Sequence, residues 1–429
     1  MSTFPASWRE VTLNDLQADV PRAITDGPFG SNLTSAHYTG EGPRVVRLQN
    51  IGDGVFNNSE AHISQQHFEG LRAHEVQADD LLIASLGNDP PRACLTPAWL
   101  GPAIVKADCI RVRLSTIVDP RWALYAMQTP AARQWAADRM YGVGRPRLGL
   151  KTIRAIPIPL PPMDEQARIL GMLDDHLSRL DNAQSLLSAS LLRTRALARA
   201  ALQALIPTIP HPGWVMATVG EAGDLKLGRQ RHPDWHNGPE MRPYLRVANV
   251  FEDRIDTSDI MQMDFSGVFE RFKLIPGDVL LNEGQSPELL GRPAMYRGVP
   301  PEVAFTNTLI RFRAGPQVLP EWALLVFRRH MHSGRFMRES RITTNIGHLS
   351  LTRLKGVEFP IPPLEVQRHI VGLASGQLSA VGRLRSEIAA VEKRLNVLRR
   401  EALSAAFSGR MASPDPSPNE VARQELASV

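Results

Sequence analysis

The sequence repeats itself at an interval of about 200 residues, and this periodicity decides which architectures are open to the chain. Ile110-Arg111-Val112-Arg113 returns as Ile310-Arg311-Phe312-Arg313, and Trp122-Ala123-Leu124 returns as Trp322-Ala323-Leu324. A junction of the pattern Pro-x-Pro-Pro-x-acid-x-Gln-x-x-Ile begins at 159 and again at 360. Because several matches keep one order and nearly one offset, the chain is expected to be a tandem duplication.

Each half of the repeat ends in a long stretch that nothing interrupts as a helix. Residues 164–205 and about 365–408 contain no proline, whereas Pro207 follows the first stretch and Gly409 follows the second. Along each stretch we expect a heptad seam with alternating spacings of four and three. The first seam is 173, 177, 180, 184, 187, 191, 194, 198, 201 and 205; the second is 374, 377, 381, 384, 388, 391, 395, 398, 402 and 405.

Two heptad seams in one chain most simply bury each other, so the helices are predicted to form an intramolecular antiparallel coiled coil. Its contact residues are expected to be Leu173, Leu177, Leu180, Leu187, Leu191, Leu384, Ile388, Leu395 and Leu398. The alternative is that each apolar stripe packs on its own domain. A paired arrangement would be a rigid spacer between two similar domains related by a pseudo-two-fold axis.

The segments before the helices are predicted to be small α+β domains. Short apolar runs at 43–48 and 278–281, bounded by Gly, Pro and Asn, indicate strands, and short helices are expected at 122–140 and 322–339. The predicted organisation is a first domain at 1–160, a helix at 161–206, a second domain at 207–361, a helix at 362–409 and a disordered tail at 410–429.

Basic residues are placed at equivalent points of the two halves. The chain has 49 Lys and Arg against 44 Asp and Glu, and 43 of the 49 are arginine, a preference over lysine that codon usage in a GC-rich genome would also produce. Their placement is more informative, because 139–154 contains five Lys and Arg and no acidic residue, and 340–355, at an offset of 201, contains three and no acidic residue, with Arg335 and Arg338 just before it. A duplicated basic loop beside each junction is typical of a protein that contacts DNA phosphates.

The sequence offers no chemistry of its own. No glycine precedes a lysine, which excludes a P-loop, and Asn88-Asp89-Pro90-Pro91 is followed by Arg92 where an adenine methyltransferase needs an aromatic residue. Two cysteines exclude a disulfide scaffold and a paired-cysteine zinc site. No apolar run reaches the ~20 residues of a membrane span and no signal peptide is visible, so a cytoplasmic protein without catalytic residues, metal ligands or a bound cofactor is expected.

Several motifs resemble the DNA specificity subunit (HsdS) of type I restriction–modification systems. Besides the two junctions and long helices, they are Gly27-Pro28-Phe29-Gly30-Ser31-Asn32-Leu33, Arg47-Leu48-Gln49-Asn50-Ile51, Arg246-Val247-Ala248-Asn249-Val250, 277–284 and Phe407-Ser408-Gly409-Arg410. The second junction has Val366-Gln367 where the first has Glu165-Gln166, a departure expected to matter little at a helix start.

The resemblance implies that each domain recognises one half of a split, asymmetric DNA sequence. The coiled coil would set the gap and dock two adenine methyltransferase subunits, and ATP-dependent restriction subunits would join them. S-adenosylmethionine, ATP and Mg would then be bound by the partner subunits. Replacing 207–360 by a homologue's segment would be expected to change one half-site only.

The residues expected to contact DNA are polar or basic and lie in Gly- and Pro-rich loops. Arginine can fork onto guanine, and Asn or Gln onto adenine, whereas the competing interpretation is turn or cap chemistry. They are Ser85, Asn88, Arg92, Arg145, Arg147 and Lys151 in the first domain, and Arg229, Arg231, Asn282, Glu283, Gln285, Arg292, Arg341 and Asn345 in the second.

Three other functions stay open at this stage. The chain could serve a methyltransferase without a nuclease, could be a coiled-coil scaffold that does not recognise DNA, or could be a methyltransferase or nuclease acting alone. A salt-sensitive DNA affinity would separate the first from the second, and activity of the isolated chain would be needed for the third.

Overall fold

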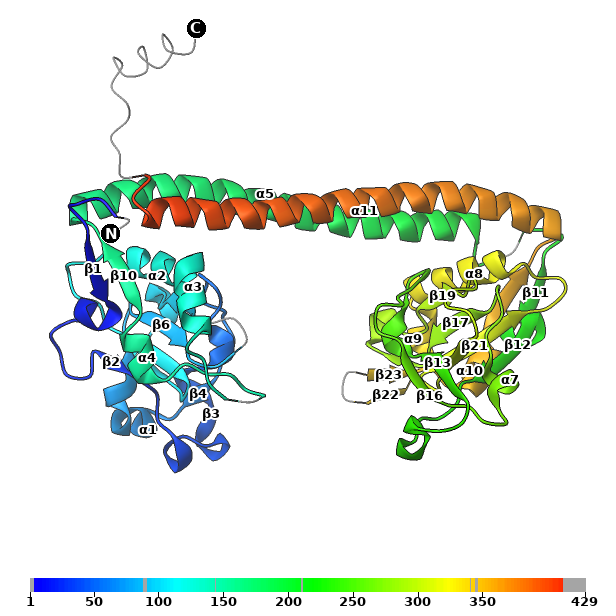
Figure 1. Cartoon of the computed structure of the whole chain (residues 1–429), viewed down its shortest axis with the longest axis horizontal. Helices are drawn as coiled ribbons and strands as arrows, with labels where there is room; N and C mark the ends of the chain where they lie inside the picture. The colour runs from blue at the N-terminus through cyan, green and yellow to red at the C-terminus, as the bar shows by residue number, and fades with distance from the viewer. Residues whose placement is uncertain are drawn as a thin grey trace, which may run out of the picture. The chain divides into compact units, whose positions relative to one another are not determined.

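The computed structural model describes residues 4–87, 91–142, 144–209, 211–339, 341–343 and 346–411, with the backbone alone at 341–343 and 346. Two compact units divide the chain. Unit 1 joins Met1–Leu186 with Val391–Val429, and unit 2 is Leu187–Ala390. Each unit combines one domain of mixed helices and strands with a part of each long helix, α5 (Met163–Leu205) and α11 (Leu364–Phe407) (Figure 1).

Unit 1 contains two four-stranded sheets and a separate two-stranded sheet that joins the start and the end of the domain. The first sheet has the order β2-β9-β6-β7, the second β4-β3-β8-β5, and the two-stranded sheet pairs β1 with β10. The strands are β1 Arg9–Thr12, β2 Ile24–Thr25, β3 Tyr38–Val46, β4 His62–Ile63, β5 Glu75–Val76, β6 Leu81–Ala84, β7 Arg92–Leu95, β8 Ala103–Val105, β9 Cys109–Val112 and β10 Pro157–Leu160. The helices are α1 Gln65–Gly70, α2 Pro120–Gln128, α3 Pro130–Ala137 and α4 Leu150–Arg154.

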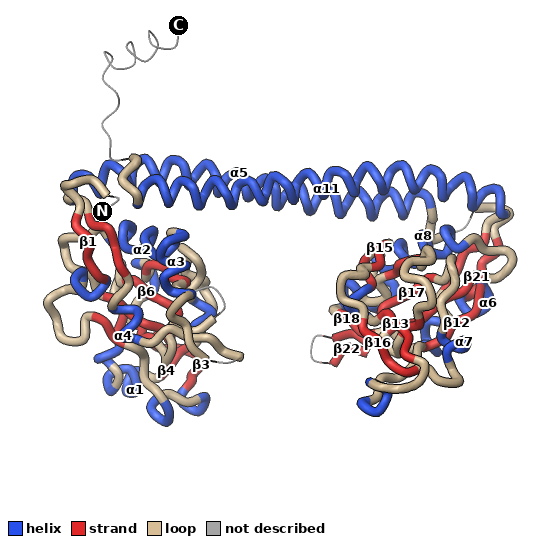
Figure 2. Tube along the Cα trace, viewed as in Figure 1, coloured by secondary structure: helices blue, strands red, loops and turns tan. Residues whose placement is uncertain are grey.

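Unit 2 follows the same plan with additional strands (Figure 2). Its main sheet has the order β12-β21-β17-β19, and β11 pairs with β24 as β1 does with β10. The strands are β11 Val215–Thr218, β12 Gly223–Leu227, β13 Met241–Leu245, β14 Val250–Phe251, β15 Arg254–Ile255, β16 Met261–Asp264, β17 Val279–Asn282, β18 Gly284–Gln285, β19 Pro293–Met295, β20 Ala304–Phe305, β21 Leu309–Ala314, β22 Arg341–Thr343, β23 Ile346–His348 and β24 Glu358–Ile361. The helices are α6 Val219–Ala222, α7 Phe269–Phe272, α8 Pro320–His332, α9 Arg335–Arg338 and α10 Leu351–Lys355.

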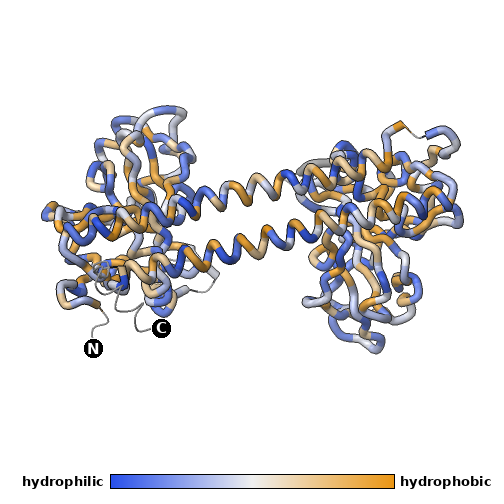
Figure 3. Tube along the Cα trace, turned by 90° about the horizontal axis from the view of Figure 1, so that it is seen from above, coloured by the Kyte–Doolittle hydropathy of each residue, from blue (hydrophilic) through white to orange (hydrophobic). Residues whose placement is uncertain are grey.

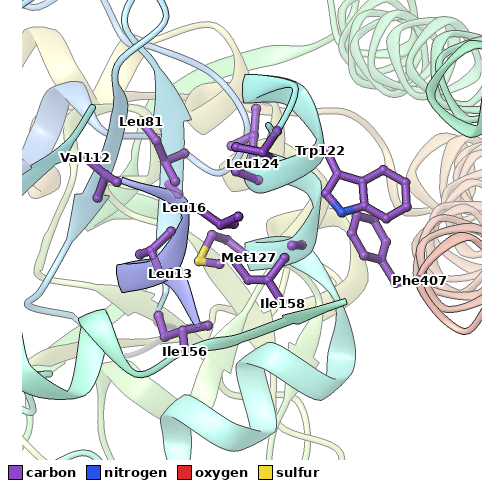
Figure 4. Close-up of a cluster of buried hydrophobic side chains, with 14 of the residues drawn as sticks. Leu13, Leu16, Leu81, Val112, Trp122, Leu124, Met127, Ile156, Ile158 and Phe407 are labelled. Atoms are coloured by element: carbon purple, nitrogen blue, oxygen red, sulfur yellow. The ribbon is translucent and has the colours of Figure 1, made fainter. Parts of the chain in front are cut away.

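The repeated tryptophan lies at the centre of each unit's core. In unit 1 Trp122 on α2 is fully buried and contacts Phe407, the last residue of α11, with ring centroids 4.3 Å apart (Figure 4). Its indole N–H donates to the carbonyl of Pro159 at 2.8 Å. Trp322 makes the equivalent bond to Pro360 at 2.9 Å in unit 2. The repeated tryptophan therefore ties each short helix to the proline-rich junction.

The short helices expected at 122–140 and 322–339 are each broken in two. Pro130 has no N–H to continue α2, and the Thr129 side chain instead accepts from the N–H of Ala132 at 3.1 Å and caps α3. In unit 2 the break falls at Gly334, whose φ of 70° lies in the left-handed region. Both breaks coincide with a residue whose backbone chemistry disfavours a continuous helix.

Within each unit the two long helices pack side by side and run in opposite directions. In unit 1 the start of α5 shares a core with the end of α11, through Leu173, Leu177 and Leu403. In unit 2 the end of α5 and the start of α11 share a core through Leu202 and Ala374. Hydrophobic and hydrophilic residues alternate along both helices in Figure 3.

The predicted seam of α5 coincides with the buried face. Leu173 and Leu177 are buried, and Leu180, Leu187 and Leu191 are half-buried. The predicted seam of α11 is wrong at every second position. Leu384 is 46% exposed and Leu398 is 54% exposed, whereas Ile388 and Leu395 are half-buried.

Polar residues one position after the wrongly assigned seam residues of α11 form hydrogen bonds with α5. Arg399 of α11 donates to Asp181 of α5, and the side-chain amide of Gln184 donates to Glu392 at 3.0 Å. At these points the face of α11 toward α5 lies one residue later than predicted, with 378, 385 and 399 half-buried and 406 buried. The displaced leucines therefore lie on an outer face of the helix.

Candidate nucleic-acid interface

A short hairpin docks on the end of a central strand in each unit. In unit 1, Tyr141 and Arg147 exchange backbone hydrogen bonds of 3.1 and 2.9 Å, and we call residues 141–147, with 143 undescribed, hairpin 1. In unit 2, β22 and β23 form hairpin 2, which pairs with β18 directly after β17. The predicted basic segments 139–154 and 340–355 contain these two hairpins.

The two hairpins are attached by equivalent backbone bonds. Leu148 N–H donates to the carbonyl of Ser85 at 2.8 Å, and Leu349 N–H donates to that of Glu283 at 2.8 Å. Both leucines are buried and anchor the following residues in the core. The structure therefore brings together, in each unit, the loop after the central strand and the basic segment that lies about 60 residues later in the sequence.

An acid–base pair lies at the same point of each hairpin. In unit 1 the guanidinium of Arg147 donates to the carboxylate of Asp108. In unit 2 the imidazole Nδ1 of His348, which faces Gly284 as Arg147 faces Leu86, lies 3.4 Å from the carboxylate of Glu283. The pairs are equivalent in place and differ in residue type, so the two units present different groups at corresponding points.

A second carboxylate stands behind the pair in unit 1. Oδ1 of Asp26 accepts from the backbone N–H groups of Gly27 at 2.8 Å and Asp108 at 3.0 Å. Burial, and secondarily the nearby charge of Asp108, raise the pKa of Asp26 to about 6, although the hydrogen bond from Gly27 opposes the rise. Asp26 therefore holds the loop of Asp108 through these hydrogen bonds, but its ionised carboxylate lowers the stability of the folded state.

We predict that Asp26→Asn stabilises the protein at high pH and not at low pH. The amide oxygen can still accept both N–H bonds, but the charge is gone. Because the folded-state pKa lies above the ordinary value of 3.8, wild-type stability falls as the pH rises through about 6. The variant should gain about 1–2 kcal/mol at pH 8, after solvent screening, and almost nothing at pH 4. Urea unfolding of both proteins at the two pH values measures this; equal differences at both would contradict it.

Unit 2 holds a second basic residue in a fixed orientation. The guanidinium of Arg229 lies 3.9 Å from the ring centroid of Trp235 and donates to the carbonyl of Asp264. Arg292 lies 4.8 Å from the ring of Phe251. Arg231 is exposed, 5.8 Å from the ring of Tyr244. Stacking of this kind orients an arginine and leaves its charge intact.

Two predicted DNA contacts are corrected by the structure. Ser85 is 3% exposed and its hydroxyl donates to the carbonyl of Asp108 at 3.2 Å, so it supports the fold beneath hairpin 1. Asn282 is 0% exposed at the end of β17, where a side chain cannot reach DNA. Ser85 directly follows β6 and Asn282 ends β17, both buried, which the sequence around them does not reveal.

The other predicted contacts fall into three groups. Arg145 and Lys151 are exposed, Glu283 and Gln285 are half-buried beside hairpin 2, and Arg92 donates to the carbonyl of Leu48 at 3.1 Å. Asn88 and Asn345 lie outside the described residues, and Arg341 is described by its backbone alone. The sequence analysis missed Asp26, Asp108 and His348, since contacts between segments far apart in the chain leave no local signal.

Other site classes have no support in the described part of the chain. No three His, Cys, Asp or Glu side chains among those residues gather closely enough to hold a metal ion. None of the described helices is long and apolar enough to cross a membrane. Contrary to expectation for a residue at a helix end, His330 is fully buried, where it lies 2.9 Å from the carbonyl of Glu358.

Comparison with known proteins shows which proteins this chain is similar to. Residues 101–188, which include hairpin 1 and the start of α5, match the family model of the type I restriction modification DNA specificity domain. The putative type I restriction enzyme MjaX specificity subunit of Methanocaldococcus jannaschii is 26% identical over 158 residues, 35% of this chain and 36% of that protein. The StySPI specificity subunit of Salmonella potsdam is 21% identical over 386 residues, 86% of this chain and 82% of that protein.

A third relative and one solved structure agree. The EcoKI specificity subunit of Escherichia coli K12 is 22% identical over 270 residues, covering 60% of this chain and 58% of that protein. A chain solved in a study of the assembly and conformational transition of the type I R-M system has a TM-score of 0.66 at 20% identity, over 94% of this chain and 98% of that chain. At this identity the structural match shows the fold alone.

Two α+β domains with hairpins on their central strands, and a matched specificity domain at residues 101–188, give the chain an architecture like that of the relatives above. The chain is similar to the specificity subunits (HsdS) of type I restriction–modification systems, the family that its motifs resemble.

Proposed function

We propose that each unit recognises one half of a split, asymmetric DNA sequence, with hairpins 1 and 2 at the DNA surface. The observation that carries this is their equivalence. Both hairpins dock on the loop after a central strand, and both present a basic side chain, Arg or His, beside a carboxylate. The paired groups differ, Arg147 with Asp108 against His348 with Glu283, which favours two different half-sites. Base edges are distinguished by such differences in donors and acceptors.

The long helices would form one antiparallel coiled coil that relates the duplicated units by a pseudo-two-fold axis and sets the gap between half-sites. Support comes from the opposite course of α5 and α11 within each unit. The polar contacts of Gln184 with Glu392 and of Arg399 with Asp181 would favour this register, because a shifted pairing would break both of them.

The same helices would dock two adenine methyltransferase subunits, one on each unit. Unit 1 exposes Leu186, Val391 and Leu398, and a groove of about 470 Å³ between its two helices is lined by Leu180, Leu398 and Ala402. Unit 2 exposes Leu192, Leu197, Leu373 and Leu384. Exposed apolar side chains on a long helix are typical of a face that packs against a partner helix.

We expect Leu398→Glu and Leu384→Glu each to weaken methyltransferase binding by at least tenfold. Removing one buried leucine and adding a carboxylate in an apolar interface costs about 1.5–3 kcal/mol or more. Ser386→Glu on the exposed face of α11 is the matched control. Co-purification and titration calorimetry with the partner methyltransferase subunit would measure the binding. Equal binding by the three variants would exclude docking on this face.

In this proposal the chain performs no reaction itself and binds no cofactor. Restriction subunits would join the methyltransferase core, and S-adenosylmethionine, ATP and Mg would be bound by those partners, in the cytoplasm. Adenine methylation profiling of the host genome with and without this gene tests the proposal. Loss of one split, asymmetric methylated motif is expected; an unchanged methylome with the partner methyltransferase expressed would favour a scaffold that does not recognise DNA.

A further inference from the structure

We propose that Asp108 is a positioning residue for DNA recognition, which orients Arg147 of hairpin 1 toward the half-site of unit 1. The inference rests on the proposed function and adds a residue that neither the motifs nor the family match assigns. Arg147 is the side chain at the base of hairpin 1, 38% exposed, with one edge of its guanidinium on the Asp108 carboxylate. The edges of the Arg147 guanidinium that do not face Asp108 are then held in a fixed direction.

Asp108 is itself fixed from several sides. Its backbone N–H donates to Asp26, and its carbonyl accepts from the N–H of Ser85 at 2.9 Å and from the Ser85 hydroxyl at 3.2 Å. Its φ of 67° lies in the left-handed region, which Asp and Asn tolerate better than other residues with a side chain. The side chain is only 23% exposed. A surface ion pair made for stability alone does not require such an anchored carboxylate, since exposed pairs are worth about 0–1 kcal/mol.

Unit 2 supports the inference independently, because it places a carboxylate at the same point by another route. The residue that corresponds to Asp108 is Thr308, whose carbonyl accepts from the N–H of Glu283 at 3.0 Å. Thr308 carries no charge, and the carboxylate beside His348 comes from Glu283 instead. Each unit therefore places a carboxylate beside the basic side chain of its hairpin, although that carboxylate comes from a different segment of the chain in each unit.

The sign of the change in DNA affinity when the charge of Asp108 is removed separates positioning from simple electrostatic attraction. Asp108 repels phosphates, so its removal should strengthen non-specific DNA binding slightly. A positioned guanidinium contributes discrimination between bases, for which a good bidentate contact is worth about 1–3 kcal/mol. Loss of Asp108 should therefore lower specific binding while non-specific binding rises, a combination that a damaged fold cannot produce.

The test compares Asp108→Asn with Asp138→Asn, which removes the same charge from an exposed position of unit 1. Asparagine tolerates the positive φ at 108, so folding should be retained. Each variant is assembled with the methyltransferase subunits and titrated with three duplexes: the methylated motif, and the motif with either half scrambled. Asp108→Asn is expected to lose about tenfold in discrimination at one half-site only, with a small rise in non-specific affinity that Asp138→Asn shares.

A double-mutant cycle decides whether Asp108 acts through Arg147. In an Arg147→Gln background, Asp108→Asn should cause no further loss of discrimination. Additive losses, equal losses at both half-sites, or wild-type discrimination in Asp108→Asn would overturn the inference. If the wild-type complex shows no sequence preference on any duplex, the proposed function itself fails, and that outcome is visible before any variant is measured.

Discussion

Exchanging residues 207–361 for the corresponding segment of a related chain with another target will replace one half of the methylated sequence and leave the other half unchanged. The segment is a structural module: it starts after α5 ends at Leu205 and stops before α11 begins at Leu364. The two-stranded β11–β24 sheet, which joins the start and the end of the domain, lies entirely inside it. Hairpin 2 and Glu283 are transferred together, so the whole proposed DNA surface of unit 2 changes at once.

The exchange must preserve the contacts that cross its boundaries. Leu202, Ile206, Ile370 and Ala374 of the long helices share the core of the domain in unit 2, so the donor needs apolar partners of similar volume there. Methylome sequencing of a host that carries the hybrid measures the outcome. The reciprocal exchange of residues 1–160 should change the opposite half. A hybrid that alters both halves would show that the two units do not act as independent recognition modules.

The two long helices show how far a hydrophobic pattern can be trusted. Proline and glycine mark helix ends through backbone chemistry, and α5 and α11 begin and end within one residue of the predicted stretches. The pattern failed inside α11, where Leu384, Val391 and Leu398 looked like every second seam position. Positions one residue later include Glu392 and Arg399, which form hydrogen bonds with Gln184 and Asp181 of α5, and a single-helix pattern cannot contain that information.

The candidate interface was predictable as a segment and not as a set of contacts. An acid-free basic stretch at the same offset in both halves located hairpins 1 and 2, because charge depletion is a local property. The pairing of Arg147 with Asp108 spans 39 residues, and that of Asp108 with Asp26 spans 82. Such pairs depend on strand order, so the sequence indicated neither. Burial of Ser85 and Asn282 was missed for the same reason.

The glutamine repeated in the two junctions is expected to be among the most important residues for stability. Gln166 is fully buried at the start of α5; its side-chain oxygen accepts from the N–H of Asp119 at 2.9 Å. Its amide donates to the carbonyls of Ile117 at 3.1 Å and Pro161 at 3.0 Å. One side chain thus satisfies three backbone groups where the chain enters α2 and leaves the junction.

Gln367 repeats this arrangement in unit 2. Its oxygen accepts from the N–H of Leu319 at 2.8 Å, and its amide donates to the carbonyls of Gln317 and Pro362, both at 2.8 Å. The equivalence explains why the glutamine recurs in both junctions while its neighbour changes from Glu165 to Val366. Of the two positions, only the glutamine satisfies buried backbone groups.

Replacing Gln166 by leucine should therefore cost about 3–5 kcal/mol, because a buried polar group without a partner costs about 1–3 kcal/mol and three would be stranded. Gln203→Leu, at an exposed position of α5, is the matched control and should stay within about 0.5 kcal/mol of wild type. Urea unfolding measures the total loss of unfolding free energy, and hydrogen exchange shows in which unit the loss occurs. Gln166→Leu should lower protection in unit 1 alone and Gln367→Leu in unit 2 alone, because each glutamine bonds only groups of its own unit. A Gln166→Leu protein as stable as Gln203→Leu would show that other groups satisfy the junction.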